Sequence, residues 1–135
     1  MSAKFDVKLR GERVQVELYG ALDGPAARGV QAEVARMTQA LTPGGFEVLF
    51  QLSGASRCSL DARIVLAELQ KDLAGRARRT AYVDERPVMR GMALWVMHLA
   101  GDANAKAVAT LAQAEQWLRG TGGRQALAPP QTVAA

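Results

Sequence analysis

The sequence has very few of the side chains on which metal sites and many enzymes depend. It contains one Cys and one His in 135 residues, so it forms no internal disulfide and cannot by itself supply a Cys and His zinc site. Long hydrophobic runs are also lacking, because the most apolar stretch, residues 88–100, is shorter than the roughly 20 residues that a membrane-spanning helix needs. We therefore expect no membrane span, no metal and no cofactor.

Aromatic residues are scarce, at three Phe, two Tyr and two Trp, and they fall at positions of apolar periodicity. The net charge of +4 and a pI near 9.7 suggest nucleic acid as a partner. However, the cations are mostly Arg scattered among acids, and exposed aromatic residues for base stacking are not evident. We expect no nucleic-acid partner. Residues 1–6 alternate between polar and apolar without a signal-peptide pattern, which predicts a cytoplasmic location.

The hydrophobic pattern changes period several times along the chain. Residues 46–52 are almost continuously apolar, which is typical of a central strand buried on both faces. Residues 20–24 and 53–59 are expected to be loops. Period-two patterns and short apolar runs predict strands over residues 5–9, 14–19, 46–52, 79–84 and 106–109, and helical periodicity predicts helices over 25–41, 61–74, 88–100 and 110–118.

This order predicts an α/β domain with a single small mixed β-sheet covered by about four helices. The opening hairpin supplies an antiparallel edge, and right-handed strand-helix-strand crossovers make the remaining strands parallel. We expect the domain to span residues 1–119, and residues 120–135, rich in Gly and Pro, to form a flexible tail.

Three stretches carry a resemblance to a known family. They are residues 48–56 before a helix, residues 79–84 before another, and residues 114–118 at the end. Together they resemble the STAS superfamily, in particular the SpoIIAA-like domains. The resemblance implies a small α/β domain without intrinsic catalysis, which regulates or scaffolds through protein–protein contacts. A related branch resembles CRAL-TRIO lipid carriers.

Ser59 is the candidate phosphoacceptor. In phosphorylation-switched STAS regulators the loop after the buried strand carries an Asp-Ser-Ser-Gly motif, whereas residues 58–61 here read Cys-Ser-Leu-Asp. A phosphate on Ser59 would lie favourably at a helix N-terminus. The same residue type at this position also predicts an N-cap, with Asp61 complementing the helix dipole, and we favour the N-cap.

The helix expected over residues 88–100 is apolar nearly all round. Its helical wheel places Val88, Met92, Trp95, Val96 and Leu99 toward the sheet. The opposite side would then carry Arg90, Leu94, Met97 and His98.

Two explanations for the apolar residues of that opposite side remain open. They contact a partner, most simply a second copy, or line an apolar ligand pocket; alternatively, another part of the chain covers them. Because the outer faces of helices on a small sheet are normally in water, we slightly favour an interface.

Catalysis is not predicted. Cys58, near a helix start, could have a lowered pKa, but nothing in the sequence places it beside His98. We therefore expect a non-catalytic regulatory or scaffolding domain that contacts a protein partner or forms a homodimer through residues 88–100. The alternative is a carrier or sensor of a small apolar, lipid-like ligand held between that helix and the sheet.

Overall fold

The computed structural model describes residues 4–120, so the tail predicted for residues 120–135 lies, apart from Gly120, outside the described residues. The elements follow the order β1 (Phe5–Arg10), β2 (Arg13–Leu18), β3 (Gly20–Leu22), α1 (Gly24–Thr38), β4 (Glu47–Gln51), β5 (Ala55–Cys58), α2 (Leu60–Ala74), β6 (Thr80–Val83), α3 (Pro87–Ala100), β7 (Ala105–Val108) and α4 (Leu111–Arg119).

The main sheet has five strands in the order β1-β2-β4-β6-β7. The β1 and β2 strands form the predicted antiparallel hairpin, and the other neighbours pair in parallel. As predicted, the apolar strand β4 lies in the middle of the sheet. The α/β class, the mixed sheet and the four helices are therefore confirmed.

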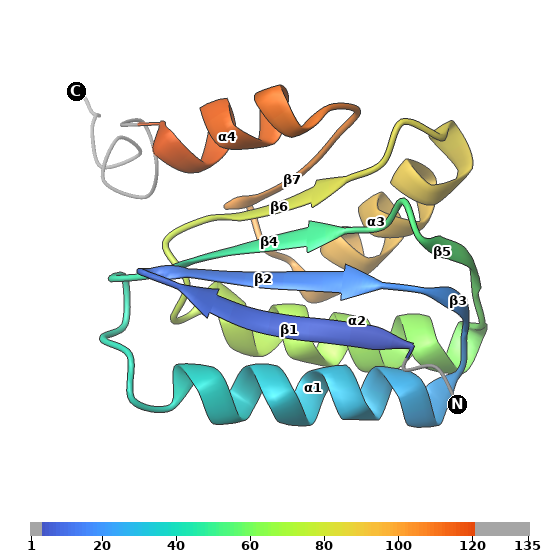
Figure 1. The fold of residues 1–135 in the computed structure, drawn as a ribbon, viewed down its shortest axis with the longest axis horizontal. Coiled ribbons are helices and arrows are strands. Elements are labelled where there is room, and N and C mark those ends of the chain that lie inside the picture. Colours follow the sequence, from blue (N-terminus) through green and yellow to red (C-terminus); the bar gives the residue numbers. More distant parts are fainter. Residues whose placement is uncertain (1–3, 121–135) are drawn as a thin grey trace.

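The helices cover both faces of the sheet (Figure 1). The α1, α2 and α3 helices pack on one face, and α4 packs on the other, against β6 and β7. Alternate residues of β4, β6 and β7 therefore enter two different cores. The larger core includes Phe50 and Tyr82, whose stacked rings have centroids 4.5 Å apart. The smaller core joins Leu49 to Ala114 and Leu118 of α4.

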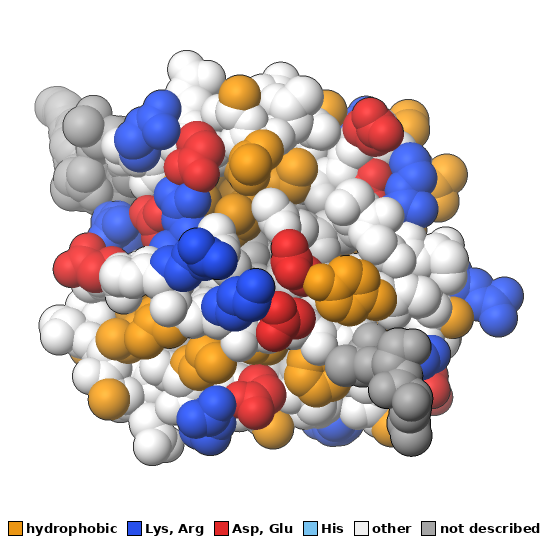
Figure 2. Space-filling view, in the orientation of Figure 1, with side chains coloured by type: hydrophobic (Ala, Val, Ile, Leu, Met, Phe, Trp, Pro, Cys, Tyr) orange, Lys and Arg blue, Asp and Glu red, His pale blue; other side chains and the backbone are white. Residues whose placement is uncertain are grey.

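The strand face that α4 leaves uncovered is polar. In Figure 2, Lys and Arg side chains lie next to Asp and Glu side chains across this view of the molecule, with hydrophobic side chains between them. Arg13 connects this face to α4, because its Nη1 and Nη2 donate to the two carboxylate oxygens of Glu115 at 2.6 and 2.8 Å while its Nε donates to Glu47 at 2.7 Å. This bidentate contact fixes α4 against the edge of the smaller core.

Local sequence signals explain where the helices begin and end. The side chain of Asp23 caps α1 and that of Ser59 caps α2. Thr110 and Gln113 form the predicted capping box at the start of α4. The α3 helix ends at Gly101, which has a φ of 72° that residues with a side chain rarely adopt.

The prediction of loops over residues 20–24 and 53–59 was wrong in part. These segments contain β3 and β5, which pair in parallel as a second, two-stranded sheet. The pairing buries Leu22, Ala55 and Cys58, while polar residues between them remain exposed. Two short segments far apart in the sequence thus pair as strands, although neither shows a clear strand pattern in its sequence.

Candidate functional site: the outer face of α3 and the start of α2

The outer face of α3 exposes large apolar side chains. The relative exposures are 81% for Val88, 53% for Leu94, 38% for Trp95 and 56% for Leu99. The outer faces of the neighbouring helices instead carry ion pairs, for example between Arg28 of α1 and Glu68 of α2. An apolar face without acidic residues is typical of the core of a protein interface.

The predicted orientation of this helix was wrong in part: Met92 and Val96 face the core and Leu94 faces outward as predicted, but other residues differ. The stripe that enters the core consists of Met89, Met92, Ala93, Val96 and Met97. Met97, which was expected on the outer side, is only 8% exposed, whereas Val88, Trp95 and Leu99 face outward. Both stripes have helical spacing, so periodicity alone could not distinguish them. Ala93 lies in the middle of the buried stripe and is completely buried.

Three of the four predicted contact residues lie together. Leu94, His98 and the edge of Met97 line a shallow hollow of about 370 Å³ near the end of α3. Arg90 does not belong to this hollow. Its Nη1 donates to the carbonyl oxygens of Asp84 and Glu85, at 3.0 and 2.8 Å, and so holds the start of α3 against the end of β6.

An ion pair between a buried carboxylate and a partly exposed arginine supports the start of α3. The Asp84 carboxylate, almost fully buried, accepts hydrogen bonds from the backbone and side chain of Arg86. The Arg86 side chain lowers the pKa of Asp84. Arg86 also donates to the carbonyl oxygen of Leu52 at the end of β4. The position of α3 is thus tied to two central strands.

Ser59 is both the N-cap of α2 and an exposed hydroxyl. Its Oγ accepts a hydrogen bond from the backbone nitrogen of Ala62 at 3.1 Å, and its own backbone nitrogen donates to Leu22 of β3 at 3.0 Å. The predicted N-cap is confirmed. The short sheet of β3 and β5 therefore fixes Ser59 at the surface, where Leu60 and Ile64 of α2 are also exposed.

A groove of about 330 Å³ connects the start of α2 with α3. Cys58 and Arg63 lie on one side of it, and Val88, Met92 and Trp95 lie on the other. The Arg63 guanidinium lies 6.0 Å from the centre of the Trp95 ring, within the range of a cation–π contact. This groove, the outer face of α3 and the exposed residues Ser59, Leu60 and Ile64 at the start of α2 are together called the α2–α3 surface.

Cys58 and His98, the two side chains considered for catalysis, lie in different hollows. Burial raises the pKa of the Cys58 thiol, against a smaller lowering effect of Arg63, so the suggestion of a lowered pKa was wrong. Cys58 lines the groove and His98 lines the separate hollow. Within residues 4–120 there is no group of three or more His, Cys, Asp or Glu that could hold a metal ion. No helix in that range is both long and apolar enough to cross a membrane.

Sequence reasoning missed several residues of the α2–α3 surface. Trp95 and Leu99 were assigned to the core, and Leu60 and Ile64 were not considered as surface contacts. One signal was present in the sequence. The stripe formed by residues 89, 92, 93, 96 and 97 continues to Ala100, whose small side chain suits close packing. The stripe predicted for the core, residues 88, 92, 95, 96 and 99, instead has the large Trp95 in its centre.

Comparisons with solved structures identify the fold. An anti-sigma factor antagonist from Mycobacterium paratuberculosis superposes with a TM-score of 0.62 at 19% identity, covering 86% of this chain and 93% of that chain. The anti-sigma factor antagonist SpoIIAA in its unphosphorylated form gives 0.60 at 20% identity, with coverages of 86% and 98%. The Bacillus cell fate determinant SpoIIAA in the phosphorylated form gives 0.56 at 21% identity, with coverages of 85% and 99%.

These identities are low, and the likeness establishes the fold rather than the activity. No protein-family model matches the sequence, and a search of curated protein sequences finds no match. The resemblance to SpoIIAA-like domains drawn from the sequence is thus confirmed as a SpoIIAA-like fold.

Proposed function

We propose that this chain is a non-catalytic, cytoplasmic regulatory domain that acts through protein–protein contacts at the α2–α3 surface. The observation that carries the proposal is the row of exposed apolar side chains on α3, at Val88, Leu94, Trp95 and Leu99. The fold adds support, since two of the similar structures are anti-sigma factor antagonists. Water-exposed apolar rows of this kind are stabilised when a partner covers them.

The partner proposed first is a second copy of the chain. The α3 helix carries no acidic residue, and its ionisable groups are Arg90 and His98. Two copies packed symmetrically about Leu94 and Trp95 would bury apolar surface and bring few charges together.

The oligomeric state tests this proposal. We expect the wild-type chain to be a dimer by sedimentation or light scattering at micromolar concentrations, and Leu94→Asp to be a monomer. Leu94 is exposed in the single chain, so this variant should still fold, at an unfolding temperature lowered only by the loss of the dimer's stabilisation. Ala35→Asp, which adds the same charge to an exposed position of α1, is the matched control and should stay dimeric. A wild-type chain that remains monomeric up to 100 micromolar would remove the homodimer.

Ser59 is the proposed phosphoacceptor of the same surface. Its hydroxyl is exposed, and a phosphate there would meet the N-terminus of α2. A similar structure, Bacillus SpoIIAA, is of a phosphorylated protein. Intact mass spectrometry after incubation with kinases of the same genome tests this role. Ser59→Asp keeps an N-cap but has no hydroxyl to modify. Ser56→Ala, on the neighbouring strand, should be phosphorylated as the wild type is.

The second candidate function is a carrier or sensor of a small apolar ligand. The observation in its favour is the groove of about 330 Å³ between α2 and α3, whose lining includes Met89, Met92 and Trp95. This volume is at the lower end for ligand pockets. Native mass spectrometry with added fatty acid should show a bound ligand, and Met92→Trp should exclude it. A failure to bind any added lipid contradicts this second function and leaves the dimer test unaffected.

A further inference from the structure

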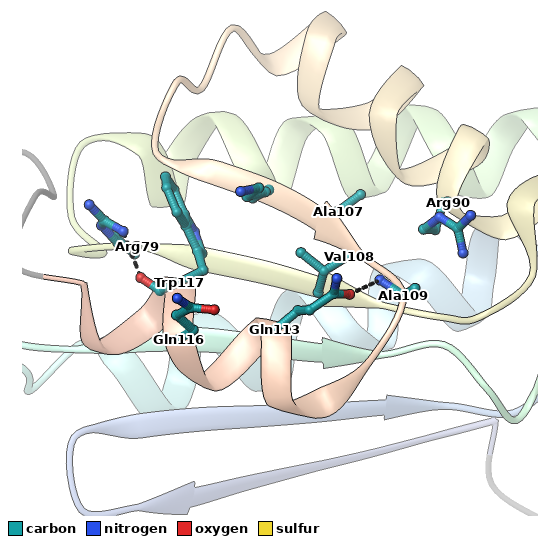
Figure 3. A pocket seen from close by; sticks show the side chains of 9 residues that line it. Arg79, Arg90, Ala107, Val108, Ala109, Gln113, Gln116 and Trp117 are labelled. Carbon is teal, nitrogen blue, oxygen red and sulfur yellow. Dashed lines mark hydrogen bonds between the residues drawn. The ribbon is translucent and has the colours of Figure 1, made fainter.

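The open edge of the main sheet, formed by β7, lies beside a second and larger groove of about 570 Å³ (Figure 3). Arg79 and Trp117 lie at one end of this groove and Arg90 at the other, while Gln113 and Gln116 of α4 lie along its side. Lys106 of β7 also contributes to its lining. We call this region the β7 groove. It is separate from the α2–α3 surface.

The backbone of β7 has unpaired groups along the groove. The carbonyl oxygens of Asn104 and Val108 accept hydrogen bonds from the backbone nitrogens of Thr80 in β6 and of Asp84 directly after it, at 3.0 and 3.1 Å. Backbone groups of alternate residues point to opposite sides of a strand, so the N–H and C=O groups of Ala105 and Ala107 point to the open edge. Within residues 4–120 no strand pairs with β7 on that side. Such an edge is a template for an added strand.

The side chains that line the β7 groove are cationic or neutral, and none is acidic. Lys106 is exposed, and its described contact is with the ring of Trp117, 5.4 Å from the Nζ to the ring centre. Two carboxylates of the same side of the sheet are already bound, since Glu47 accepts from Arg13 and Arg78, and Glu115 accepts from Arg13. The groove therefore carries positive charge without an acidic partner of its own.

Arg79 is a buried cation with no acidic partner among residues 4–120. It is 6% exposed, its guanidinium lies 3.8 Å from the centre of the Trp117 ring, and its Nη1 donates to the Trp117 carbonyl oxygen at 2.6 Å. Its Nε has no hydrogen-bond partner in the part of the chain that the structure describes. Burial and the charge of Arg78 both lower the pKa of Arg79. A negative charge in the groove would offset this unfavourable environment.

We propose that the β7 groove binds an extended acidic peptide segment of a partner protein, which adds to the sheet as a strand beside β7. Pairing with Ala105 and Ala107 would supply the backbone hydrogen bonds. Side chains of the added strand alternate between its two faces, so those at every second position would lie on the face of Lys106 and Trp117. Acidic residues at these positions would complement the cations of the groove.

Fluorescence of Trp117 provides the test. Trp95→Phe leaves Trp117 as the remaining Trp of the chain, and the titrant is a blocked hexapeptide in which Glu alternates with Thr. We expect a saturable change in emission that weakens as salt is raised. The amides of Ala105 and Ala107 should become protected from hydrogen exchange. The matched peptide in which Lys replaces Glu should not bind.

Two variants distinguish the contribution of charge to peptide binding from the contribution of strand addition. Lys106→Glu reverses an exposed charge and should weaken binding at least about fivefold. Ala107→Pro removes the N–H that points to the open edge, while the residues that pair with β6 keep theirs, so it should abolish binding with little change in thermal unfolding. Should Ala107→Pro fail to fold, an acidic peptide with N-methylated backbone nitrogens, which should not bind the wild-type chain, replaces it.

The contrary results are equally specific. An absence of any saturable change at millimolar peptide would overturn the proposal. Wild-type affinity for Ala107→Pro would overturn it too, because binding would then be electrostatic without strand addition. A mixed-sequence single-stranded oligonucleotide that binds more tightly than the acidic peptide would point to nucleic acid instead. Leu94→Asp should bind the peptide as the wild type does, so failure here is distinct from failure of the proposed dimer.

Discussion

The two faces of the main sheet are built differently, although the same strands supply both. On the face covered by α1, α2 and α3, side chains such as Val16, Phe50 and Leu73 are completely buried in one large core. On the other face α4 covers mainly β6 and β7, with a small core of five buried residues. Ion pairs and cation–π contacts around Arg13 and Arg79 complete that side.

This difference indicates that the larger core supplies most of the stability, and that the α4 side changes conformation more easily. Burial of apolar area dominates the stability of a small domain, so the larger core should determine the global free energy of unfolding. The side of α4 depends on fewer buried groups and on contacts that water and salt weaken. Both the proposed β7 groove and its Trp117 belong to this second side. The following predictions measure how far the two faces differ.

The largest effect should come from a matched pair of Leu→Ala substitutions. Leu73 of α2 lies in the larger core and Leu118 of α4 in the smaller one, and both are at most 2% exposed. We expect Leu73→Ala to lower the free energy of unfolding by about 3 to 4 kcal/mol and Leu118→Ala by about 2 kcal/mol, because the thin α4 layer can close around the cavity. Urea unfolding measures both. Equal losses would contradict the proposed difference between the faces.

A buried polar network on the three-helix side should come next in size. The Tyr82 hydroxyl donates to Gln70 Oε1 at 2.5 Å, and Gln70 Nε2 donates to Asp102 at 2.8 Å. Burial raises the pKa of Tyr82, which keeps its hydroxyl protonated as a donor. Tyr82→Phe leaves the Gln70 oxygen buried without that donor and should cost about 1 to 3 kcal/mol.

Tyr19 supplies the matched control for that network. Its hydroxyl also donates to a side-chain oxygen, that of Glu17 at 2.7 Å, but both residues lie at the surface. Tyr19→Phe should therefore change the free energy of urea unfolding by less than about 0.5 kcal/mol, since water replaces the lost bond. Similar losses for the Tyr82 and Tyr19 variants would show that the Gln70 network is not shielded from water.

A smaller effect is expected at the helix caps, one on each face. Ser59→Ala and Thr110→Ala each remove a side chain that accepts a hydrogen bond from a first-turn backbone nitrogen, at a cost of about 1 kcal/mol. Ser59→Ala should lower the global stability seen in thermal unfolding. Thr110→Ala should instead appear mainly as faster hydrogen exchange within α4, because that helix can open by itself. Identical global shifts for both variants would indicate that α4 unfolds only with the rest of the domain.

Much of this architecture could be predicted from the sequence, and the reasons are local. Alternation over β1 and β2, the apolar run of β4 and the capping box at Thr110 are signals read within a few residues. The missed strands β3 and β5 have no such signal, since their stability depends on pairing with each other across more than thirty residues. Non-local pairing of short strands is not encoded in any one window of sequence.

The site was harder to predict than the fold for a related reason. Two apolar stripes of α3 satisfy the same helical period, and only packing against the layer beneath decides that Met97 is buried and Trp95 is not. The β7 groove was also unforeseen, because Arg79, Arg90, Lys106 and Trp117 are distant in sequence. The groove is positively charged in part because Glu47 and Glu115 pair with Arg13 and Arg78 instead, and these ion pairs form only in the tertiary structure.

The smallest expected effect concerns the ion pair that joins α4 to the sheet. Arg13 holds the Glu115 carboxylate through two hydrogen bonds and lowers the pKa of that carboxyl. A folded-state pKa below the unfolded value, near 4.3, means that the pair contributes stability above about pH 4.3. This contribution is lost as the pH falls through the lower, folded-state pKa. The carboxylate is partly exposed, so the contribution should be about 0.5 to 1 kcal/mol.

Glu115→Gln should therefore make opening of α4 less sensitive to acid. Trp117 emission in the Trp95→Phe background reports this opening between pH 6 and 3, and we expect the acid-induced change to be smaller in the Gln variant. Asp84, whose pKa is also lowered, lies between β6 and α3, so its protonation should destabilise the main core. Asp84→Asn should consequently shift global unfolding, and leave the pH dependence of α4 opening unchanged. If both variants altered the two transitions alike, the faces would unfold as one unit, and the α4 side would be no more adaptable than the main core.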